Sequence, residues 1–346
     1  MLINNLLYTS SLEKWFSSLP LEKLNGQTVM VTGATGMIGS CLVDMLCHWN
    51  RCGGNVRIVA TSRNVSRLQD RFGAENDRLQ FVQWDVEEIM GADITVDYII
   101  HSASNADPVS YANYPVQTLL ANVLGVNTLL DFGRHHGLKR ILYVSSGEMY
   151  GQPDENFSDF VEGYCGPVDY SSARACYPAG KRSAEVLCQS YIKQYDMDAV
   201  IVRPCHIFGP TMTRSDSRAA SEFLRNAAAG KPIVLKSAGL VERSHCYVAD
   251  AAAAILLTML KGEKGSAYNI ADPDYRMTIR VFAEKAAQAG GYQVIYADPS
   301  DAEKAGYSPV SRAVLNSDKL QNLGWHPNHQ DFSAIELTVN ILREIN

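Results

Sequence analysis

Two side chains with complementary acid–base chemistry, Tyr177 and Lys181, lie four positions apart in the chain. On a helix this spacing places both side chains on one face. A free tyrosine has a pKa of about 10, but a neighbouring ammonium group favours the phenolate and lowers that pKa. The pair therefore predicts a base that removes a proton from a hydroxyl group as hydride leaves the same carbon. An ordinary pair of helix residues is the alternative, because the spacing is common by chance.

A hydroxyl and a carboxylate are predicted near this pair. Ser145, Ser146 and Glu148 follow a predicted strand, at the edge where parallel sheets bind ligands. A serine hydroxyl there can hydrogen-bond the reacting oxygen, and Glu148 supplies a further acid–base or electrostatic group. A polar turn with a solvated glutamate is the alternative. We favour the functional interpretation for Glu148, because a simple redox or epimerisation step does not need it.

A glycine-rich turn lies near the start of the chain, between a predicted strand and a predicted helix. Its first glycine permits a tight turn, its second permits close approach of a pyrophosphate, and its third lets the helix pack close to the sheet. The helix N-terminus then faces the phosphates. This context predicts dinucleotide binding by the run Gly33, Ala34, Thr35, Gly36, Met37, Ile38 and Gly39.

The choice between NAD and NADP depends on the end of the second predicted strand. An acidic residue there would bond the adenosine ribose of NAD. The chain instead has Ser62 and Arg63, and Arg63 could pair with the 2′-phosphate of NADP. A solvated arginine that starts the next helix is the equal alternative. Asp85 and Val86, after the third strand, are expected near the adenine.

Strands and helices alternate along the first two hundred residues. Such alternation predicts an α/β fold of the Rossmann type, a doubly wound parallel sheet with helices on both faces. Strands are predicted over Gln27–Thr32, Val56–Thr61, Leu79–Val82, Val96–His101, Arg140–Ser145 and Ala199–Val202. Helices are predicted over Gly36–Trp49, Val65–Phe72, Pro115–His135 and Ala179–Tyr195.

The pattern divides the chain into three parts. Residues 1–25 form an N-terminal extension, in which Leu12, Trp15, Phe16 and Leu19 have helical spacing. Inward packing of this extension is favoured over a dimer contact. Residues 26–210 form the dinucleotide-binding domain, and residues 211–346 form a smaller, mainly helical C-terminal lobe. In that lobe we predict helices over Ser221–Ala229, His245–Leu260 and Arg280–Ala289, and strands over Ile233–Leu235 and Ala267–Ile270.

Composition narrows the class of protein. The 346 residues carry a net charge of −6, which disfavours nucleic-acid binding because basic side chains drive that interaction. The eight cysteines form no zinc-type spacing, so no metal is predicted, and they indicate reduced thiols in the cytoplasm. The longest apolar run, Ala251–Leu260, is about half a membrane span, and no signal peptide is apparent.

Taken together, these motifs resemble the extended short-chain dehydrogenase/reductase family of nucleotide-sugar enzymes, over Gln27 to Pro327 and most closely its UDP-glucuronate decarboxylase group. The loop His101-Ser-Ala-Ser104 is similar to the H-L-A-S of that group, and Ser146-Gly-Glu148-Met-Tyr150-Gly151 is similar to its T-S-E-V-Y-G. The segment Arg174-Ala-Cys-Tyr177-Pro-Ala-Gly-Lys181-Arg182 resembles its R-A-C-Y-D-E-G-K-R. Gly209-Pro210 followed by Arg218 has the same gap as its substrate segment.

The resemblance implies a role for each matched residue. Tyr177 would be the base, Lys181 its activator, Ser146 a partner of the C4″ oxygen, and Glu148 an aid to chemistry beside C4″. NAD or NADP would also contact Ser102, Ala103, Ser104 and Asn122. A nucleotide-diphosphate sugar would contact Tyr111, Glu148, Arg174, His206, Arg218 and Arg243, with Arg218 near the sugar carboxylate and Arg243 on a phosphate. A homodimer is also implied.

The chain departs from the family pattern at several positions. His206 replaces an asparagine, Gly147 replaces the middle residue of T-S-E, and Pro178-Ala179 replace an acidic pair. The leading expectation is C4″ oxidation followed by loss of CO2 from an acid sugar. A 4,6-dehydratase, a 4-epimerase, an NADPH-dependent reductase and a non-catalytic dinucleotide sensor are the alternatives.

Overall fold

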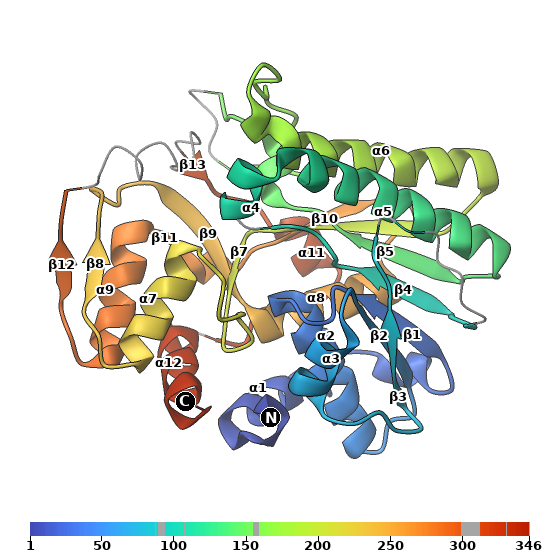
Figure 1. Cartoon of the computed structure of the whole chain (residues 1–346), viewed down its shortest axis with the longest axis horizontal. Helices are drawn as coiled ribbons and strands as arrows, with labels where there is room; N and C mark the ends of the chain where they lie inside the picture. The colour runs from blue at the N-terminus through green and yellow to red at the C-terminus, as the bar shows by residue number, and fades with distance from the viewer. Residues whose placement is uncertain are drawn as a thin grey trace.

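The computed structural model describes residues 1–86, 88, 94–106, 108–154, 159–298, 312–329 and 331–345. A seven-stranded, wholly parallel sheet runs through the centre in the order β10-β6-β5-β4-β1-β2-β3 (Figure 1). The predicted doubly wound fold is confirmed. The strands are β1 (Thr28–Thr32), β2 (Arg57–Ser62), β3 (Leu79–Gln83), β4 (Tyr98–His101), β5 (Arg140–Val144), β6 (Ala199–Pro204) and β10 (Ala267–Ile270).

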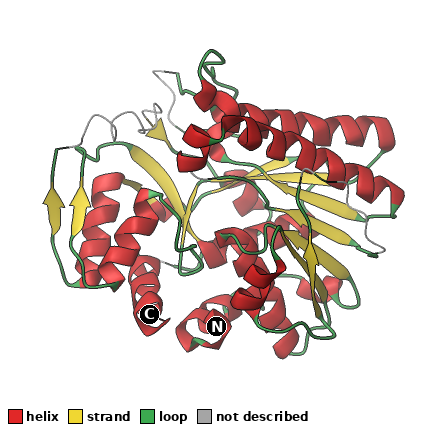
Figure 2. Ribbon diagram, viewed as in Figure 1, coloured by secondary structure: helices red, strands yellow, loops and turns green. Residues whose placement is uncertain are grey.

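Helices cover both faces of this sheet (Figure 2). Strand β1 shows why: Val29 and Val31 join one buried cluster, whereas Met30 joins another on the opposite face. A strand that is buried on both faces has no polar side and needs two helical layers. One layer contains α2 (Met37–Arg51), α3 (Val65–Phe72) and α8 (Val248–Lys261), and the other contains α5 (Pro115–His135) and α6 (Cys176–Tyr195).

The order of strands reverses between β1 and β4. From β1 the chain proceeds to β2 and β3 on one side, and then crosses back to β4 on the other side. Loops at the carboxyl ends of β1 and β4 therefore separate and leave a crevice, which is where open α/β sheets bind ligands.

A smaller lobe lies beside the large sheet. Its sheet contains β7 (His206–Phe208), β9 (Glu242–Tyr247), β11 (Arg276–Thr278) and β13 (Arg312–Ala313), with β8 (Ile233–Leu235) and β12 (Val294–Tyr296) as a separate pair. Helices α7 (Ala219–Ala228), α9 (Ile279–Gly290) and α12 (Ser333–Ile345) pack together there. The C-terminal half also returns to the large sheet, because β10 pairs with β6 and α8 packs against α2.

The helix predicted over His245–Leu260 is wrong in its first turn. His245, Cys246 and Tyr247 belong to β9 and pair in parallel with His206, Ile207 and Phe208 of β7. Helix α8 begins only at Val248. Tertiary pairing overrides the local apolar pattern here, because a short strand and a buried helix both appear as continuous apolar runs.

The N-terminal segment packs inward, as predicted. It contains α1 (Leu6–Glu13), whereas the following residues to Leu19 form turns. Leu12, Trp15 and Leu19 are buried in the main core cluster. The two termini meet, since the Asn5 side chain donates a hydrogen bond to Glu344 at 2.7 Å (Figure 1). Within the described residues, no helix is both long and apolar enough to cross a membrane.

Candidate active site

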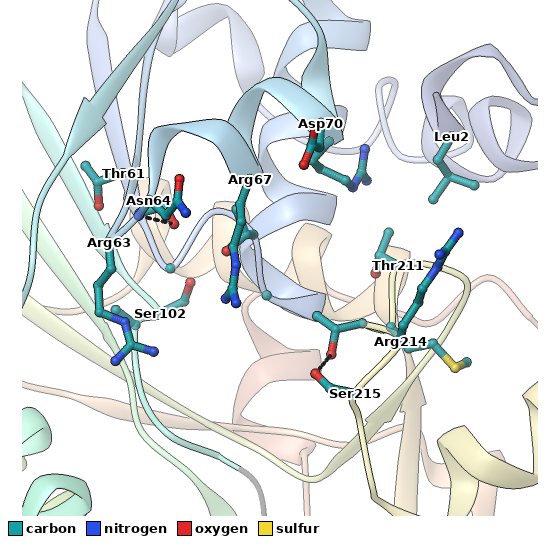
Figure 3. Close-up of a pocket in the computed structure, with 18 of the residues that line it drawn as sticks. Leu2, Thr61, Arg63, Asn64, Arg67, Asp70, Ser102, Thr211, Arg214 and Ser215 are labelled. Carbon is teal, nitrogen blue, oxygen red and sulfur yellow. Dashed lines mark hydrogen bonds between the residues drawn. The ribbon is translucent and has the colours of Figure 1, made fainter. Parts of the chain in front are cut away.

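A cavity of about 1910 Å³ occupies the crevice at the carboxyl ends of the parallel strands (Figure 3). It is ample for a dinucleotide, because ligand pockets commonly measure about 300–1,000 Å³. Ten of the residues predicted to contact the cofactor line it. They are Gly33, Thr35, Gly36, Ser62, Arg63, Asp85, Val86, Ser102, Ala103 and Ser104.

The glycine-rich turn fits a dinucleotide phosphate because two of its positions admit no side chain. Gly33 has φ +66°, and a Cβ there would lie 2.7 Å from the Ala103 Cα. A Cβ on Gly39 would lie 2.3 Å from the Gly33 carbonyl oxygen. Gly36 is the N-cap of α2, so the first turn of that helix opens toward the cavity. This arrangement supplies the anion-binding helix terminus that a pyrophosphate needs.

Six other predicted cofactor residues do not line the cavity: Met37, Ile38, Gly39, Asn122, Tyr177 and Lys181. Met37, Ile38 and Gly39 form the first turn of α2 beneath the glycine-rich turn. Asn122 is buried: its amide donates to the Thr118 carbonyl at 2.7 Å, and its oxygen accepts from Ser104 at 3.0 Å. Asn122 therefore holds Ser104, which does line the cavity.

Helix α6 carries Tyr177 and Lys181 on one face, as the spacing predicts. The helix begins at Cys176, three residues before the predicted start, so Tyr177 and Pro178 both lie within its first turn. That position tolerates proline, because the first amides of a helix have no intrahelical partner. Tyr177 is buried, and its ring stacks on Tyr111 with centroids 4.5 Å apart.

The structure corrects the predicted ionisation of Tyr177. Burial raises the pKa of Tyr177 to about 12, and the charge of Glu148 adds to this rise. Hydrogen bonding to the Ser146 and Tyr111 side chains acts in the opposite direction. Burial also lowers the pKa of Lys181 to about 7, so its ammonium charge is weakened rather than available at full strength. Sequence spacing gives proximity but not desolvation, which dominates in this site.

Lys181 is held against the end of β5. Its Nζ donates to the Val144 carbonyl at 2.9 Å and lies 5.6 Å from the centre of the Tyr177 ring. One turn further along α6, Glu185 pairs with Arg203 at 2.6 Å and accepts from the Ser145 hydroxyl at 2.6 Å. The Ser145 hydroxyl is therefore held in this buried network. Ser146 is the serine that forms a hydrogen bond with Tyr177.

Glu148 and Arg174 form an ion pair of 2.9 Å between a carboxylate oxygen and a guanidinium nitrogen. The Arg174 guanidinium also lies over the Tyr111 ring at 4.5 Å. Both members of the ion pair are partly exposed. The structure therefore brings Glu148, Arg174 and Tyr111 together beside Tyr177.

Arg243 and His206 meet on the opposite lobe, on paired strands β9 and β7. The Arg243 guanidinium donates to His206 Nε2 at 3.1 Å. Burial and the charge of Arg243 hold the pKa of His206 well below its usual range, so this ring is neutral and can accept that bond. Arg243 Nε is buried and, among the described residues, has no hydrogen-bond partner. An anionic ligand group would satisfy it.

Arg218 approaches the same site from the loop before α7. It pairs with Asp216 at 2.6 Å and also contacts the Met37 sulfur at 3.5 Å. Its charge lowers the pKa of Tyr177, which indicates that the two side chains lie near one another. Arg218 is therefore positioned between the glycine-rich turn and the reaction centre, but part of its charge is already neutralised.

Several polar residues that line the cavity were not predicted from the sequence, among them Asn64, Arg67, Thr211 and Arg214. Asn64 and Arg67 belong to the turn and helix after β2, where the sequence analysis predicts a cofactor contact for Arg63 alone. Thr211 donates to the Met37 carbonyl at 2.9 Å and so joins the loop after β7 to the first turn of α2. These residues are close in sequence to Arg63 or to Gly209-Pro210, and that closeness could have indicated them. Whether their side chains point into the cavity depends on the tertiary fold.

Comparison with known proteins identifies the family. Residues 29–271 match the model of the NAD dependent epimerase/dehydratase family. UDP-glucuronic acid decarboxylase 6 of Arabidopsis thaliana is 34% identical over 248 residues, which cover 71% of this chain and 69% of that protein. UDP-glucuronic acid decarboxylase 1 of Xenopus tropicalis is 30% identical over 89% of this chain and 70% of that protein. The chain therefore belongs to the NAD-dependent epimerase/dehydratase family of nucleotide-sugar enzymes.

Solved structures support the same fold. A dTDP-glucose 4,6-dehydratase from Streptomyces venezuelae, solved with NAD, has a TM-score of 0.77 at 23% identity, covering 92% of this chain and 97% of its own. A UDP-glucuronic acid 4-epimerase from Bacillus cereus has a TM-score of 0.76 at 19% identity, covering 92% and 100%. NAD is the cofactor of this family, and the glycine-rich turn with the N-terminus of α2 fits the pyrophosphate of such a dinucleotide.

Proposed function

We propose that this protein oxidises C4″ of an acidic nucleotide sugar transiently and releases CO2, as a UDP-glucuronate decarboxylase does. The observation that carries the proposal is Arg243, a partly buried arginine whose Nε is buried and has no hydrogen-bond partner among the described residues. Burial lowers the pKa of Arg243, and the charge of Glu148 opposes this fall, so the two side chains lie near one another. Buried cations require an anionic partner. The two decarboxylase relatives support an acid sugar as the source of that anion.

The residues around Tyr177 suit removal of the C4″ proton. Ser146 and Tyr111 stabilise the Tyr177 phenolate through hydrogen bonds, and Lys181 holds a proton close to it. The chemistry that NAD(P)+ supplies when bound is reversible hydride transfer. A 4-keto sugar with a carboxylate at C6″ is a β-keto acid, so the bond between C5″ and C6″ breaks with its electron pair delocalised toward the C4″ oxygen. Reprotonation at C5″ and return of hydride then give a pentose.

Gly147 disfavours the dehydratase alternative. The resemblance places an acidic proton donor at this position in hexose dehydratases. Here a Cβ on Gly147 would lie 3.2 Å from both Leu315 methyl carbons, so a carboxylate side chain has little room. Glu148, the carboxylate next to Gly147 in the chain, forms an ion pair with Arg174. We infer that elimination of water is poorly supported by this pocket.

The proposal is tested by NMR of the anomeric protons. Purified protein is incubated with UDP-glucuronate and either NAD+ or NADP+. Appearance of a UDP-pentose with an equal amount of CO2 is expected. A 4-keto hexose, a C4″ epimer or an unchanged spectrum with both cofactors would contradict the proposal. Arg243→Ala should abolish turnover, whereas Arg280→Ala, at a partly exposed arginine of α9 that does not line the cavity, should not.

We also propose that the protein is a cytoplasmic homodimer. Helix α5 exposes Val116, Leu119, Leu120 and Leu124, which helical spacing places on one side. All eight cysteines are free, which suits a reducing compartment. Sedimentation velocity should show a dimer, and Leu120→Glu should give a folded monomer. A wild-type monomer at micromolar concentration would contradict the dimer.

For the domains, we propose that residues 26–210 bind the cofactor and that residues 211–346 hold the sugar, apart from α8 and β10. The placement of Arg243 and His206 on β9 and β7 supports a contribution to the sugar site from both sides of residue 210. Residues 1–25 join the two parts.

A further inference from the structure

The end of β2 lacks the group that would bind an unmodified adenosine ribose. Dinucleotide sites for NAD place a carboxylate there to accept from the ribose hydroxyls. In this chain β2 ends at Ser62, followed by Arg63 and Asn64. The Asn64 side chain is already used, because its oxygen accepts from the Ser66 amide at 2.8 Å and caps α3. The site therefore offers donors where a ribose diol needs an acceptor.

Two arginines flank this position and line the same cavity. Arg63 precedes α3, Arg67 lies in its first turn, and Figure 3 shows both side chains extending in the same direction. Both are exposed, and neither forms an ion pair with any residue that the structure describes. Arg71, one turn beyond Arg67, differs: it is neutralised by the buried Asp44. Arg63 and Arg67 thus keep their full positive charge.

Three acidic residues line the cavity: Asp85 follows β3, which pairs with the end of β2, whereas the other two lie away from that end. Asp70 lies farther along α3, and Figure 3 places it at the opposite end of that helix from Arg63. Glu344 is bound by Asn5 near the chain termini. The N-terminus of α3 adds a partial positive charge beside the arginines. Two arginines and the helix terminus therefore outweigh the single carboxylate of Asp85, and the local field favours an anion.

We infer that the turn between β2 and α3 binds the 2′-phosphate of NADP(H), and that this chain prefers the phosphorylated cofactor within an NAD-dependent family. Guanidinium groups match the geometry of phosphate oxygens and remain charged at all relevant pH values. The inference deepens the proposed function by choosing its cofactor. It concerns binding alone and can be measured without any sugar substrate.

The first experiment measures the dissociation constants of NADPH and NADH for the wild-type protein by nicotinamide fluorescence. NADPH is expected to bind at least about tenfold more tightly, the value of one charge-assisted hydrogen bond. Adenosine 2′,5′-bisphosphate should likewise displace NADPH at lower concentration than ADP. Equal affinities, or tighter binding of NADH, would overturn the inference.

Variants then test the named residues. Arg63→Ala and Arg67→Ala should each weaken NADPH binding about tenfold and leave NADH binding within about twofold. The matched control is Arg57→Ala, because Arg57 is exposed at the other end of β2 and does not line the cavity. It should change neither constant. Equal weakening of both cofactors by Arg63→Ala would assign this arginine to a shared part of the dinucleotide and overturn the inference.

The two proposals fail separately. If UDP-glucuronate is not decarboxylated but NADPH still binds more tightly than NADH, the proposed reaction is wrong and the 2′-phosphate site stands. If decarboxylation occurs and NADH binds as tightly as NADPH, the proposed reaction stands and the 2′-phosphate site is wrong. Circular dichroism of each variant verifies that it is folded.

Discussion

At the scale of the residue, Tyr177 shows how burial and hydrogen bonding compete. Burial raises its pKa to about 12, whereas Ser146, Tyr111 and Arg218 act to lower it. A buried phenolate is costly unless several donors surround it. The site supplies such donors, and a bound cofactor that carries positive charge would shift the balance further toward the phenolate.

Replacement of Tyr177 by phenylalanine should remove the base without unfolding the protein. The expected loss of turnover is about 10²–10⁴-fold, the usual contribution of acid–base catalysis. Binding of the cofactor should persist. The measurement is cofactor reduction after mixing with the sugar nucleotide. Tyr195→Phe, at the exposed end of α6, is the control, and a Tyr177→Phe variant with near-normal turnover would contradict the assignment.

Removal of the charge of Glu148 should shift the pH dependence of the reaction. Glu148 raises the pKa of Tyr177, so Glu148→Gln should lower that pKa. The rise of rate with pH should then occur about half to one pH unit lower. The pH profile of cofactor reduction measures the shift. Glu22→Gln, exposed on the N-terminal segment, should leave the profile unchanged, and a shift to higher pH would refute the argument.

At the scale of the element, the turn between β1 and α2 depends on the absence of side chains. Gly39→Ala would bring a Cβ within 2.3 Å of the Gly33 carbonyl oxygen. We expect destabilisation of about 1–3 kcal/mol, as for other overpacked sites. Cofactor affinity should also fall, because the displaced turn holds the pyrophosphate. Urea unfolding and cofactor titration test both effects, with Gly163→Ala, which meets open space, as control. Unchanged affinity would exclude this turn from the binding site.

At the scale of the whole molecule, the N-terminal segment connects elements that are far apart in the sequence. The Trp15 indole donates to Asp250 at 2.9 Å and stacks on Trp325 at 6.4 Å. Asp250 also contacts His329 at 3.0 Å. Tyr8 donates to the buried Asp44 of α2 at 2.9 Å. One segment therefore contacts α2, α8 and the C-terminal region.

Trp15→Ala should destabilise the whole protein by about 3–5 kcal/mol, because it empties a buried site and leaves the Asp250 oxygen without its donor. Equilibrium unfolding in urea measures the loss. Leu6→Ala, at an 80% exposed position of the same segment, should cost less than about 0.5 kcal/mol. Similar unfolding curves for both variants would show that the segment is dispensable for stability.

The buried Lys181 predicts how stability changes with pH. Its pKa falls to about 7 in the folded protein, from about 10.4 in an unfolded chain. Between these values the unfolded chain binds more protons, so stability should rise with pH, by at most about 1.4 kcal/mol per unit. Lys181→Met should lose this rise between pH 7 and 9, below the titration of tyrosine. Parallel stability curves for the two proteins would contradict the prediction.

The sequence by itself determined the strand–helix alternation, the glycine-rich turn and the pairing of Tyr177 with Lys181. These features are local: they rest on period, on turn geometry and on side chains one helical turn apart. Two predicted helices, Val65–Phe72 and Pro115–His135, have the bounds found in the structure, because each has clear signals at both ends.

Only the tertiary structure decided which strands pair and which charges are buried. The return of β10 to the large sheet, the strand at His245 and the bond between Arg243 and His206 all join segments far apart in the chain. The same holds for the pKa of Tyr177, which depends on desolvation by the whole surrounding protein. Desolvation and long-range pairing arise only when the chain is compact. A local pattern of residues therefore does not predict them.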